Sequence, residues 1–279
     1  DVLTSRGLGD VYKRQAIELG NKLLKKSNNP LSSDISKIIG ESHFNLKNYK
    51  ESLPFLIAYD GKNKKWTNAD FYQLGYVYYV NKNYSEAINQ FTKIIDQSNS
   101  LSQNAYYHLG DCYLKVEKKI EALGAFKKAS EMNFDQNVRE DSLLQYAKLG
   151  FEIGNSYEPF VDVMIRFLDL FPKNPSSQNI KSLLALSYTR GGNYDLAIKI
   201  LESKVTFKDN NILQKVLYLK ALNLYQNEQY TDSQFFLKKS IKLNRDPIVT
   251  ARSYLLEGQA LFELKLYGPS KLSYDQYYK

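Results

Sequence analysis

The feature that most constrains this chain is an internal repeat of about 36 residues. Seven positions occupied mostly by glycine or alanine recur at spacings of 35, 35, 38, 37, 36 and 37 residues. These anchor positions are Gly40, Gly75, Gly110, Lys148, Ala185, Ala221 and Gly258. A period of this length is typical of solenoids, in which each unit buries its apolar face only by stacking on its neighbours. The sequence therefore predicts an array of seven units over residues 31–279.

Other positions keep the same register relative to the anchors. Nine residues after each anchor stand Tyr49, Tyr84, Lys119, Tyr157, Tyr194, Tyr230 and Tyr267. Twelve residues after stand Ser52, Ala87, Ala122, Phe160, Ala197, Ser233 and Ser270, and four residues further on a large apolar residue follows in every unit. Offsets of three and four place side chains on one face of a helix. Each unit thus predicts two amphipathic helices joined by a polar turn.

Small residues on both helices of a unit predict close contact between the two backbones. We expect this contact, with the tyrosine beside it, to hold the helix pair together. A leucine at Ala87 or Ala197 should overpack it, at a cost of about 1–3 kcal/mol. The residues predicted to pack the repeats are Gly75, Tyr84, Ala87, Gly110, Ala122, Ala185, Tyr194 and Ala197.

The repeat resembles the tetratricopeptide repeat (TPR), most closely in AYYHLGDCYLKVEKKIEALGAFKKA, residues 105–129. The resemblance covers residues 16–279 and implies an all-α solenoid, a right-handed superhelix of stacked antiparallel helix pairs. The second, third and fifth units are strong matches. The fourth departs from the pattern, because Lys148 and Phe160 stand where small residues are expected.

Both ends of the sequence read differently from the array. Residues 1–15 match nothing downstream, and DVYKRQ at 10–15 resembles a sequencing-adapter read-through, so we predict that this segment is not native. Residues 16–30 read as the second helix of a truncated repeat. The chain stops near the second helix of the last unit without a polar capping helix, which solenoids usually need. We therefore expect the native protein to be longer and its own N-terminus to be missing here.

Charge and composition do not point to nucleic acid or to a membrane. The chain carries 38 Lys and Arg against 30 Asp and Glu, a net charge of +8. The lysines are scattered, without a block of five like charges, and no apolar run approaches the length of a membrane span. The single cysteine, Cys112, allows no internal disulfide.

Residues able to carry catalysis are few. His108 and Cys112 lie four residues apart on a predicted helix, with Asp111 beside them, and this is the one constellation that suggests a thiolate or a metal pair. Two ligands do not make a metal site, and phosphate-binding loops and hydrolase motifs are absent from the sequence. We predict a protein without catalytic residues, metal or cofactor.

A binding surface is predicted on the first helices of the units, which line the concave face of such an array. The expected positions lie three residues before, one after and four after each anchor. They are Tyr72, Tyr76, Tyr79, Tyr107, Asp111 and Leu114 in the second and third units, and Tyr218, Leu222 and Tyr225 in the sixth. Tyrosines suit peptide recognition, although the same rings can serve as packing. The Lys, Asn and Arg clamp of chaperone-binding relatives is missing, because its places hold residues such as Lys37, Glu41 and His108.

The predicted function is protein–protein interaction through a peptide or protein segment bound on this face. The segment at residues 167–197 resembles repeat junctions of bacterial periplasmic and outer-membrane-associated TPR proteins, which favours a cell-envelope assembly. One alternative is an RNA-binding helical-repeat protein, against which stand the drifting period and the fact that lysines do not collect at the groove positions. Another is a structural spacer within a larger regulator or enzyme.

Overall fold

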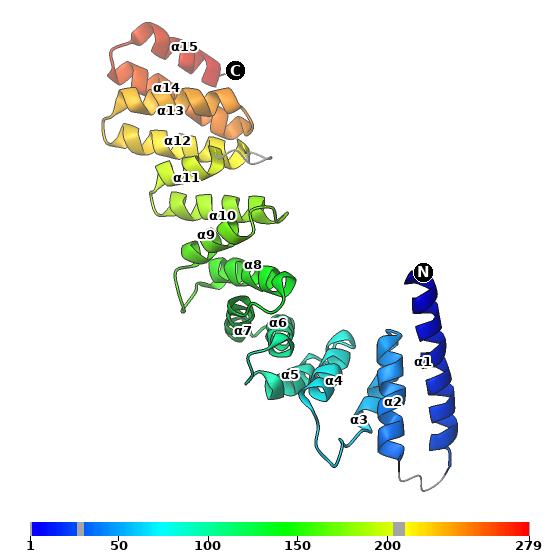
Figure 1. Cartoon of the computed structure of the whole chain (residues 1–279). Helices are drawn as coiled ribbons and strands as arrows, with labels where there is room; N and C mark the ends of the chain where they lie inside the picture. The colour runs from blue at the N-terminus through cyan, green and yellow to red at the C-terminus, as the bar shows by residue number, and fades with distance from the viewer. Residues whose placement is uncertain (1, 27–30, 203–209, 279) are drawn as a thin grey trace. The chain divides into compact units, whose positions relative to one another are not determined.

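A computed structural model describes residues 2–26, 31–202 and 210–278, with side chains from residue 9 onward. Every regular element in these ranges is helical, and the only bridge between extended residues joins Lys62 to Lys65. The chain divides into two compact units, residues 1–155 and 156–279. The predicted all-α helical-pair architecture is confirmed (Figure 1).

Unit 1 contains three complete helix pairs, preceded by one helix and followed by another. Consecutive helices pack on each other, and in addition α4 packs on α6 and α6 packs on α8. The elements are α1 (Val2–Leu24), α2 (Ser32–Asn45), α3 (Tyr49–Ile57), α4 (Asn68–Val80), α5 (Tyr84–Phe91), the 3₁₀ turn η1 (Thr92–Ile94), α6 (Ser100–Lys115), α7 (Lys119–Glu131) and α8 (Gln136–Ile153).

Unit 2 repeats the same scheme. Its helix α9 packs on α10, and three complete pairs follow, with α12 packed on both α13 and α14. The elements are α9 (Phe160–Leu170), α10 (Ser177–Arg190), α11 (Tyr194–Glu202), α12 (Asn210–Gln226), α13 (Tyr230–Leu243), α14 (Pro247–Glu263) and α15 (Tyr267–Tyr277).

Six of the helix pairs share one three-residue turn. Its middle residue is left-handed, with φ between 60° and 75°, and is Lys47, Lys82, Glu117, Gly192, Glu228 or Lys265. The amide after it donates to the carbonyl five residues back, for example Asn83 N–H to the Tyr78 carbonyl at 2.8 Å. This is the Schellman arrangement that ends helices, normally with glycine in the left-handed position. Here only Gly192 satisfies that preference.

The residue after each of these turns is the first residue of a new helix. Tyr49, Tyr84, Tyr194, Tyr230 and Tyr267 are the first residues of α3, α5, α11, α13 and α15. The tyrosine nine residues after each anchor therefore marks where the second helix begins. Lys119 takes the same place at the start of α7.

Close packing within a pair joins the anchor to the large residue sixteen positions later. A Cβ on Gly75 would lie 2.9 Å from the Phe91 ring, and one on Gly110 would lie 2.7 Å from the Phe126 ring. Both rings are buried, with at most 1% of their surface exposed. The absence of a side chain at the anchor thus makes room for a ring that contributes about 2–3 kcal/mol by its burial. The alanines at 87, 122, 185 and 197 are also fully buried.

Serine replaces alanine on the second helix of three pairs without disturbing the contact. The hydroxyls of Ser52, Ser233 and Ser270 donate to the carbonyls of their own anchors, Gly40, Ala221 and Gly258, at 2.7–2.8 Å. A buried hydroxyl without a partner would be costly. The anchor carbonyl accepts this hydrogen bond in the first, sixth and seventh repeats.

The fourth repeat differs from its sequence-based description. The fully buried small residue of α8 is Ala147, one position before the anchor Lys148, which is only partly buried. On α9 the buried pair four residues apart is Val163 and Phe167, and Phe160 is only the first, partly buried residue of that helix. The segment between α8 and α9, residues 154–159, is longer than the three-residue turns and contains Tyr157. This insertion moves the second helix out of the register that the anchor spacing predicts.

Residues 16–24 form the end of α1, which packs on α2 and begins at Val2. The contact is close at Gly20, where a Cβ would meet the side chain of Ile39 at 2.6 Å. Residues 27–30 of the predicted truncated repeat lie outside the described residues. That residues 1–15 are not native stays a prediction, because a helix over this segment does not test its origin.

Two buried glutamines fix the junctions between pairs. Gln103 on α6 accepts from the amides of Phe134 and Asp135 and donates to the carbonyls of Ala129, Met132 and Asp135. Gln214 on α12 accepts from the amides of Arg245 and Asp246 and donates to Thr250. Both side chains are completely buried.

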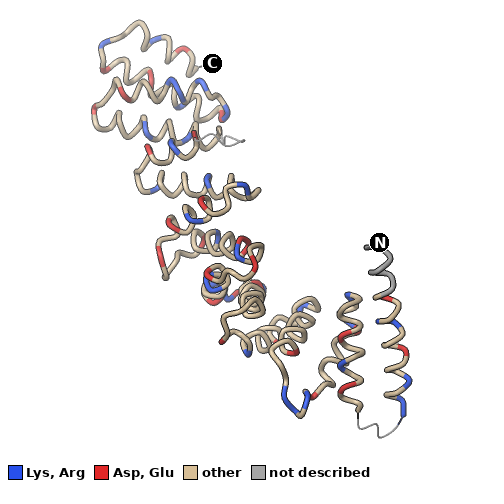
Figure 2. Tube along the Cα trace, in the orientation of Figure 1, with Lys and Arg blue, Asp and Glu red and all other residues tan. Residues whose placement is uncertain are grey.

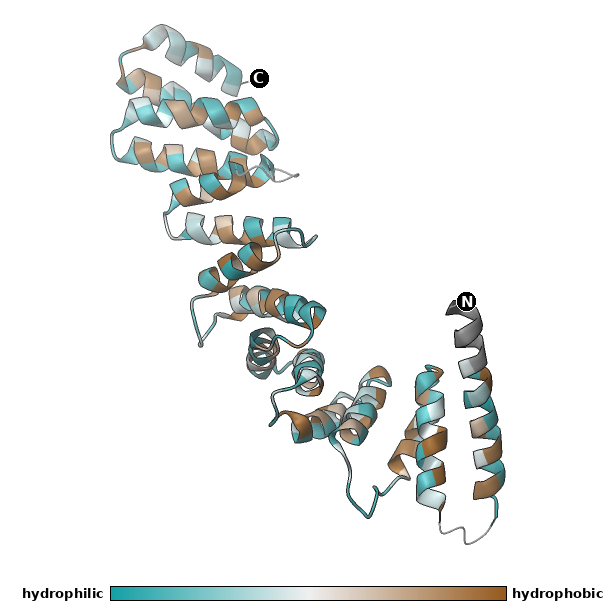
Figure 3. Cartoon of the chain, in the orientation of Figure 1, coloured by the Kyte–Doolittle hydropathy of each residue, from teal (hydrophilic) through white to brown (hydrophobic). Residues whose placement is uncertain are grey.

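Hydropathy and charge follow the helix pairs. Most helices carry both hydrophobic and hydrophilic residues, as amphipathic helices do (Figure 3). Lysine and arginine alternate with acidic residues along both units (Figure 2). Within the ranges that the structure describes, no helix has the length and apolar character needed to cross a membrane.

Candidate functional site

The six predicted binding residues of unit 1 lie on α4 and α6, two helices in contact. We name Tyr72, Tyr76, Tyr79 and Tyr107 the tyrosine row. All four rings are partly buried, as are Asp111 and Leu114. The rings therefore pack against neighbours and also keep part of their surface in contact with solvent.

A hydrogen bond joins the two helices at one end of the row. The Tyr79 hydroxyl donates to Asp111 Oδ2 at 2.5 Å. Burial, and then this bond to a carboxylate, raise the pKa of Tyr79. The phenol therefore stays protonated at physiological pH and holds Asp111 in a fixed place.

His108 fills the centre of the row. Its ring lies 5.1 Å from that of Tyr79 and 5.3 Å from that of Tyr76, and it stacks on Phe91 at 5.5 Å. Burial lowers the pKa of His108 to about 4, although the charge of Asp111 opposes this. Its Nδ1 atom is buried without a hydrogen bond. The imidazole is therefore neutral at pH 7 and acts as an aromatic packing group.

The neighbouring Cys112 has no exposed surface, and burial followed by the charge of Asp111 raises its pKa to about 12. A thiol in this state is neither a nucleophile nor a metal ligand. In the part of the chain whose side chains are described, no three His, Cys, Asp or Glu residues come together as a metal site would require.

Tyr72 and Tyr107 differ in their surroundings. Tyr72 contacts Phe91 at 5.7 Å and His108 at 6.1 Å, and burial raises its pKa to about 12. The pKa of Tyr107 is raised by burial and then by the charges of Asp141 and Asp111. The Tyr107 hydroxyl, which has no hydrogen-bond partner among the described residues, faces this acidic surrounding.

Residues that the sequence pattern did not single out extend the row toward α2 and α3. Phe44 and Tyr49 each contact the Tyr76 ring edge to face, at 5.8 and 5.6 Å. Lys37, at a place of the chaperone clamp, instead pairs with the buried Asp70 at 2.6 Å. Phe44 stands at the groove offset four residues after its anchor, Gly40, and could have been found by that offset, whereas Tyr49 lies outside the three groove offsets.

The predicted residues of unit 2 lie on α12. Tyr218, Leu222 and Tyr225 pack against the buried cluster of Ala221, Leu237 and Leu256. Tyr225 also contacts Tyr230 at 5.3 Å. These side chains are partly buried, and no histidine fills the space between them as His108 does in unit 1.

Comparison with known proteins gives few sequence matches. A family model described as anaphase-promoting complex, cyclosome, subunit 3, matches residues 61–129, the second and third repeats. A comparison with curated proteins finds no match.

Solved structures are similar over most of the chain. The complex of Naa15/Naa10 bound to HypK-THB is 17% identical, with a TM-score of 0.57, over 85% of this chain and 35% of that one. The C-terminal part of a TPR repeat-containing protein from Cytophaga hutchinsonii is 19% identical, with a TM-score of 0.42, over 74% and 77% of the two chains. A tetratricopeptide repeat protein from Parabacteroides merdae is 17% identical, with a TM-score of 0.44, over 91% and 97%.

The stacked helix pairs and the turns that they share define an α-solenoid. Its repeat is of the tetratricopeptide type, and the chain has the tetratricopeptide-repeat fold. Such a fold suits a protein–protein interaction scaffold.

Proposed function

We propose that unit 1 binds a segment of a partner protein along the tyrosine row and that the chain is a scaffold without catalytic activity. The observation that carries this proposal is the row itself, because four partly exposed rings share one neutral aromatic support, His108. Tyrosines offer a large contact area and a polar group at small entropic cost.

The row is held in place before any partner arrives. The hydrogen bond from Tyr79 to Asp111 joins α4 to α6, and the ring of Phe91 stacks on that of His108. A surface whose side chains are already ordered loses less entropy on binding. The free hydroxyl of Tyr107 and the carboxylate of Asp111 would give a bound backbone its hydrogen bonds.

The test is a selection of displayed peptides on the purified chain, followed by affinity measurements with variants. Replacing Tyr76 and Tyr107 together with alanine should weaken the selected peptides by about tenfold or more, as loss of central aromatic contacts does. Tyr72 is left intact because it packs on Phe91. The matched control is Tyr278→Ala, a ring that is 83% exposed. Equal binding to both variants would show that the row serves only as packing.

We also propose that this scaffold works in a bacterial cell-envelope assembly, in the periplasm or at the outer membrane. The support is the resemblance of residues 167–197 to repeat junctions of envelope-associated TPR proteins. Fractionation of source cells with an antibody against the chain tests it, and recovery in the cytosolic fraction alone would contradict it.

A further inference from the structure

A second site lies on unit 1, on a face of α4 other than the tyrosine row. The longest connection between consecutive pairs of this unit, residues 58–67, contains a tight turn at Lys62 to Lys65. Asn63 and Lys64 both have positive φ, 53° and 59°, and the Lys65 amide donates to the Lys62 carbonyl at 3.1 Å. These dihedral angles are those of a type I′ turn, which is a rigid hairpin connection. The turn therefore fixes the backbone from which Lys64 and Trp66 extend.

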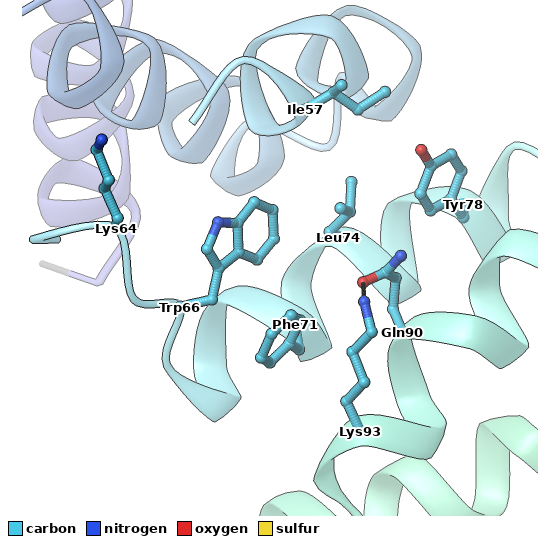
Figure 4. Close-up of a pocket in the computed structure, with 8 residues that line it drawn as sticks. All are labelled: Ile57, Lys64, Trp66, Phe71, Leu74, Tyr78, Gln90 and Lys93. Carbon is cyan, nitrogen blue, oxygen red and sulfur yellow. Dashed lines mark hydrogen bonds between the residues drawn. The ribbon is translucent and has the colours of Figure 1, made fainter. Parts of the chain in front are cut away.

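Between this turn and helices α3 to α5 lies an open pocket of about 430 Å³, within the size range of ligand sites (Figure 4). Its apolar wall is formed by Ile57, Trp66, Phe71 and Leu74. The polar lining is formed by Lys64, Tyr78, Gln90 and Lys93.

The polar groups at the rim are mainly donors. Lys93 Nζ donates to Gln90 Oε1 at 3.0 Å and lies 4.8 Å from the centre of the Phe71 ring, without a carboxylate partner (Figure 4). Lys64 is exposed and forms no salt bridge with any residue whose side chain is described, although its charge helps to lower the pKa of the Asp60 carboxyl. The nearby carboxylate of Asp60 accepts a hydrogen bond from Ser33. The pocket lining thus combines two lysines with an apolar wall and contains no carboxylate.

We propose that this pocket binds an acidic segment of a partner protein, with an apolar side chain against Trp66 and Phe71 and its carboxylates on Lys64 and Lys93. Charge complementarity favours this occupant, because the lining contains two ammonium groups and no carboxylate. The apolar wall would bury the side chain beside the charges.

A single-stranded nucleic acid fits the pocket less well. Recognition of bases uses aromatic faces that are free to stack. Trp66 already stacks on Phe71 at 5.3 Å and lies against Tyr59 at 5.8 Å. The observations therefore favour a peptide.

The experiment uses the full chain, whose only tryptophan is Trp66. Its fluorescence is titrated with the capped peptide Asp-Glu-Phe-Asp-Glu, with the neutral Asn-Gln-Phe-Asn-Gln and with Asp-Glu-Ala-Asp-Glu. We expect a saturable change with the first peptide and clearly weaker binding of the other two. Lys64→Gln and Lys93→Gln should each weaken the first peptide by up to about fivefold, the contribution of one exposed ion pair.

Lys50→Gln is the matched control, because it removes one exposed charge from α3 outside the pocket and should leave the affinity unchanged. Equal binding of the neutral peptide, or no saturable response, would overturn the proposal. So would tighter binding of an oligothymidylate at the same lysines. A response that persists in the double variant of Tyr76 and Tyr107 separates this site from the tyrosine row.

Discussion

The third repeat of the chain, in unit 1, and the sixth, in unit 2, reach the same helix-pair geometry with different side chains. In α6 and α7 a glycine, Gly110, makes room for the Phe126 ring. In α12 and α13 the corresponding residues are Ala221 and Leu237, both completely buried. In these two repeats the larger anchor is matched by a smaller partner, so the two side-chain volumes compensate each other.

The two repeats also agree where the sequence pattern gives no hint. Gln103 and Gln214 occupy the same place, seven residues before the anchor, and each binds the amides at the start of the next helix. Glu117 and Glu228 both occupy the left-handed turn position. The repeats differ two residues before the anchor, where His108 of unit 1 corresponds to Leu219 of unit 2.

The largest expected effect comes from removing a junction glutamine. Gln103→Leu should lower the free energy of unfolding of unit 1 by about 3 kcal/mol, because five hydrogen bonds at the α7–α8 junction lose their partner. Urea unfolding followed by Trp66 fluorescence measures it. Gln214→Leu, measured by hydrogen exchange of α13 and α14, should cost less, since three such bonds are lost. Equal, negligible effects would show that the glutamines are replaceable.

Acid should lower the stability of unit 1 more than that of unit 2. The folded-state pKa of His108 is about 4, below the unfolded value of about 6.5, so the unfolded chain binds more protons between these two values. The stability of unit 1 should therefore fall as the pH drops from about 6.5 to about 4, by about 3 kcal/mol. Burial also lowers the pKa of His43, the other histidine of the chain, which adds to the same trend. Unit 2 contains no histidine.

Urea unfolding at several pH values, followed by Trp66 fluorescence, measures this dependence. His108→Phe keeps an aromatic ring in the cluster and should remove most of the slope. A slope that is unchanged in this variant would assign the acid sensitivity to other groups.

The third test replaces the anchor residue and its packing partner in the third repeat with the residues found in the sixth. Gly110→Ala places a methyl group 2.7 Å from the Phe126 ring and should cost about 1–2 kcal/mol. Adding Phe126→Leu reproduces the pair found in the sixth repeat and should recover part of this loss. A double-mutant cycle by urea unfolding gives the coupling, and strict additivity would refute volume compensation.

The smallest expected effect is a gain. Glu117→Gly and Glu228→Gly remove a side chain from a residue in the left-handed conformation and so relieve its backbone strain. Each should stabilise its repeat by about 0.5–1 kcal/mol. Gly192→Ala, the reverse change in the turn of the fifth pair, should destabilise. Thermal unfolding by circular dichroism compares the three variants, and a loss of stability in both glycine variants would contradict the account of the turn.

Much of the fold followed from the sequence alone. The spacing of anchors such as Gly75 and Gly110, with tyrosines nine residues later, predicted the helix pairs and where most second helices begin, because contact between two helices restricts residue size at fixed helical offsets. The same offsets placed Tyr72, Tyr76, Tyr79 and Tyr107 on neighbouring helices. The repeat pattern failed in the fourth unit, where a longer connection precedes α9 and the buried small residue is Ala147.

Only the tertiary structure decided what depends on contacts between repeats and on backbone conformation. It assigned the left-handed turn position to Lys82, which lies between two asparagines, and to Glu117, because the Schellman geometry counts residues from the helix end. It placed His108 among the rings of the tyrosine row. It also placed Trp66 in the same pocket lining as Lys64 and Lys93. The sequence determined the periodic packing because that packing is local, whereas these sites depend on neighbours that lie in other helices.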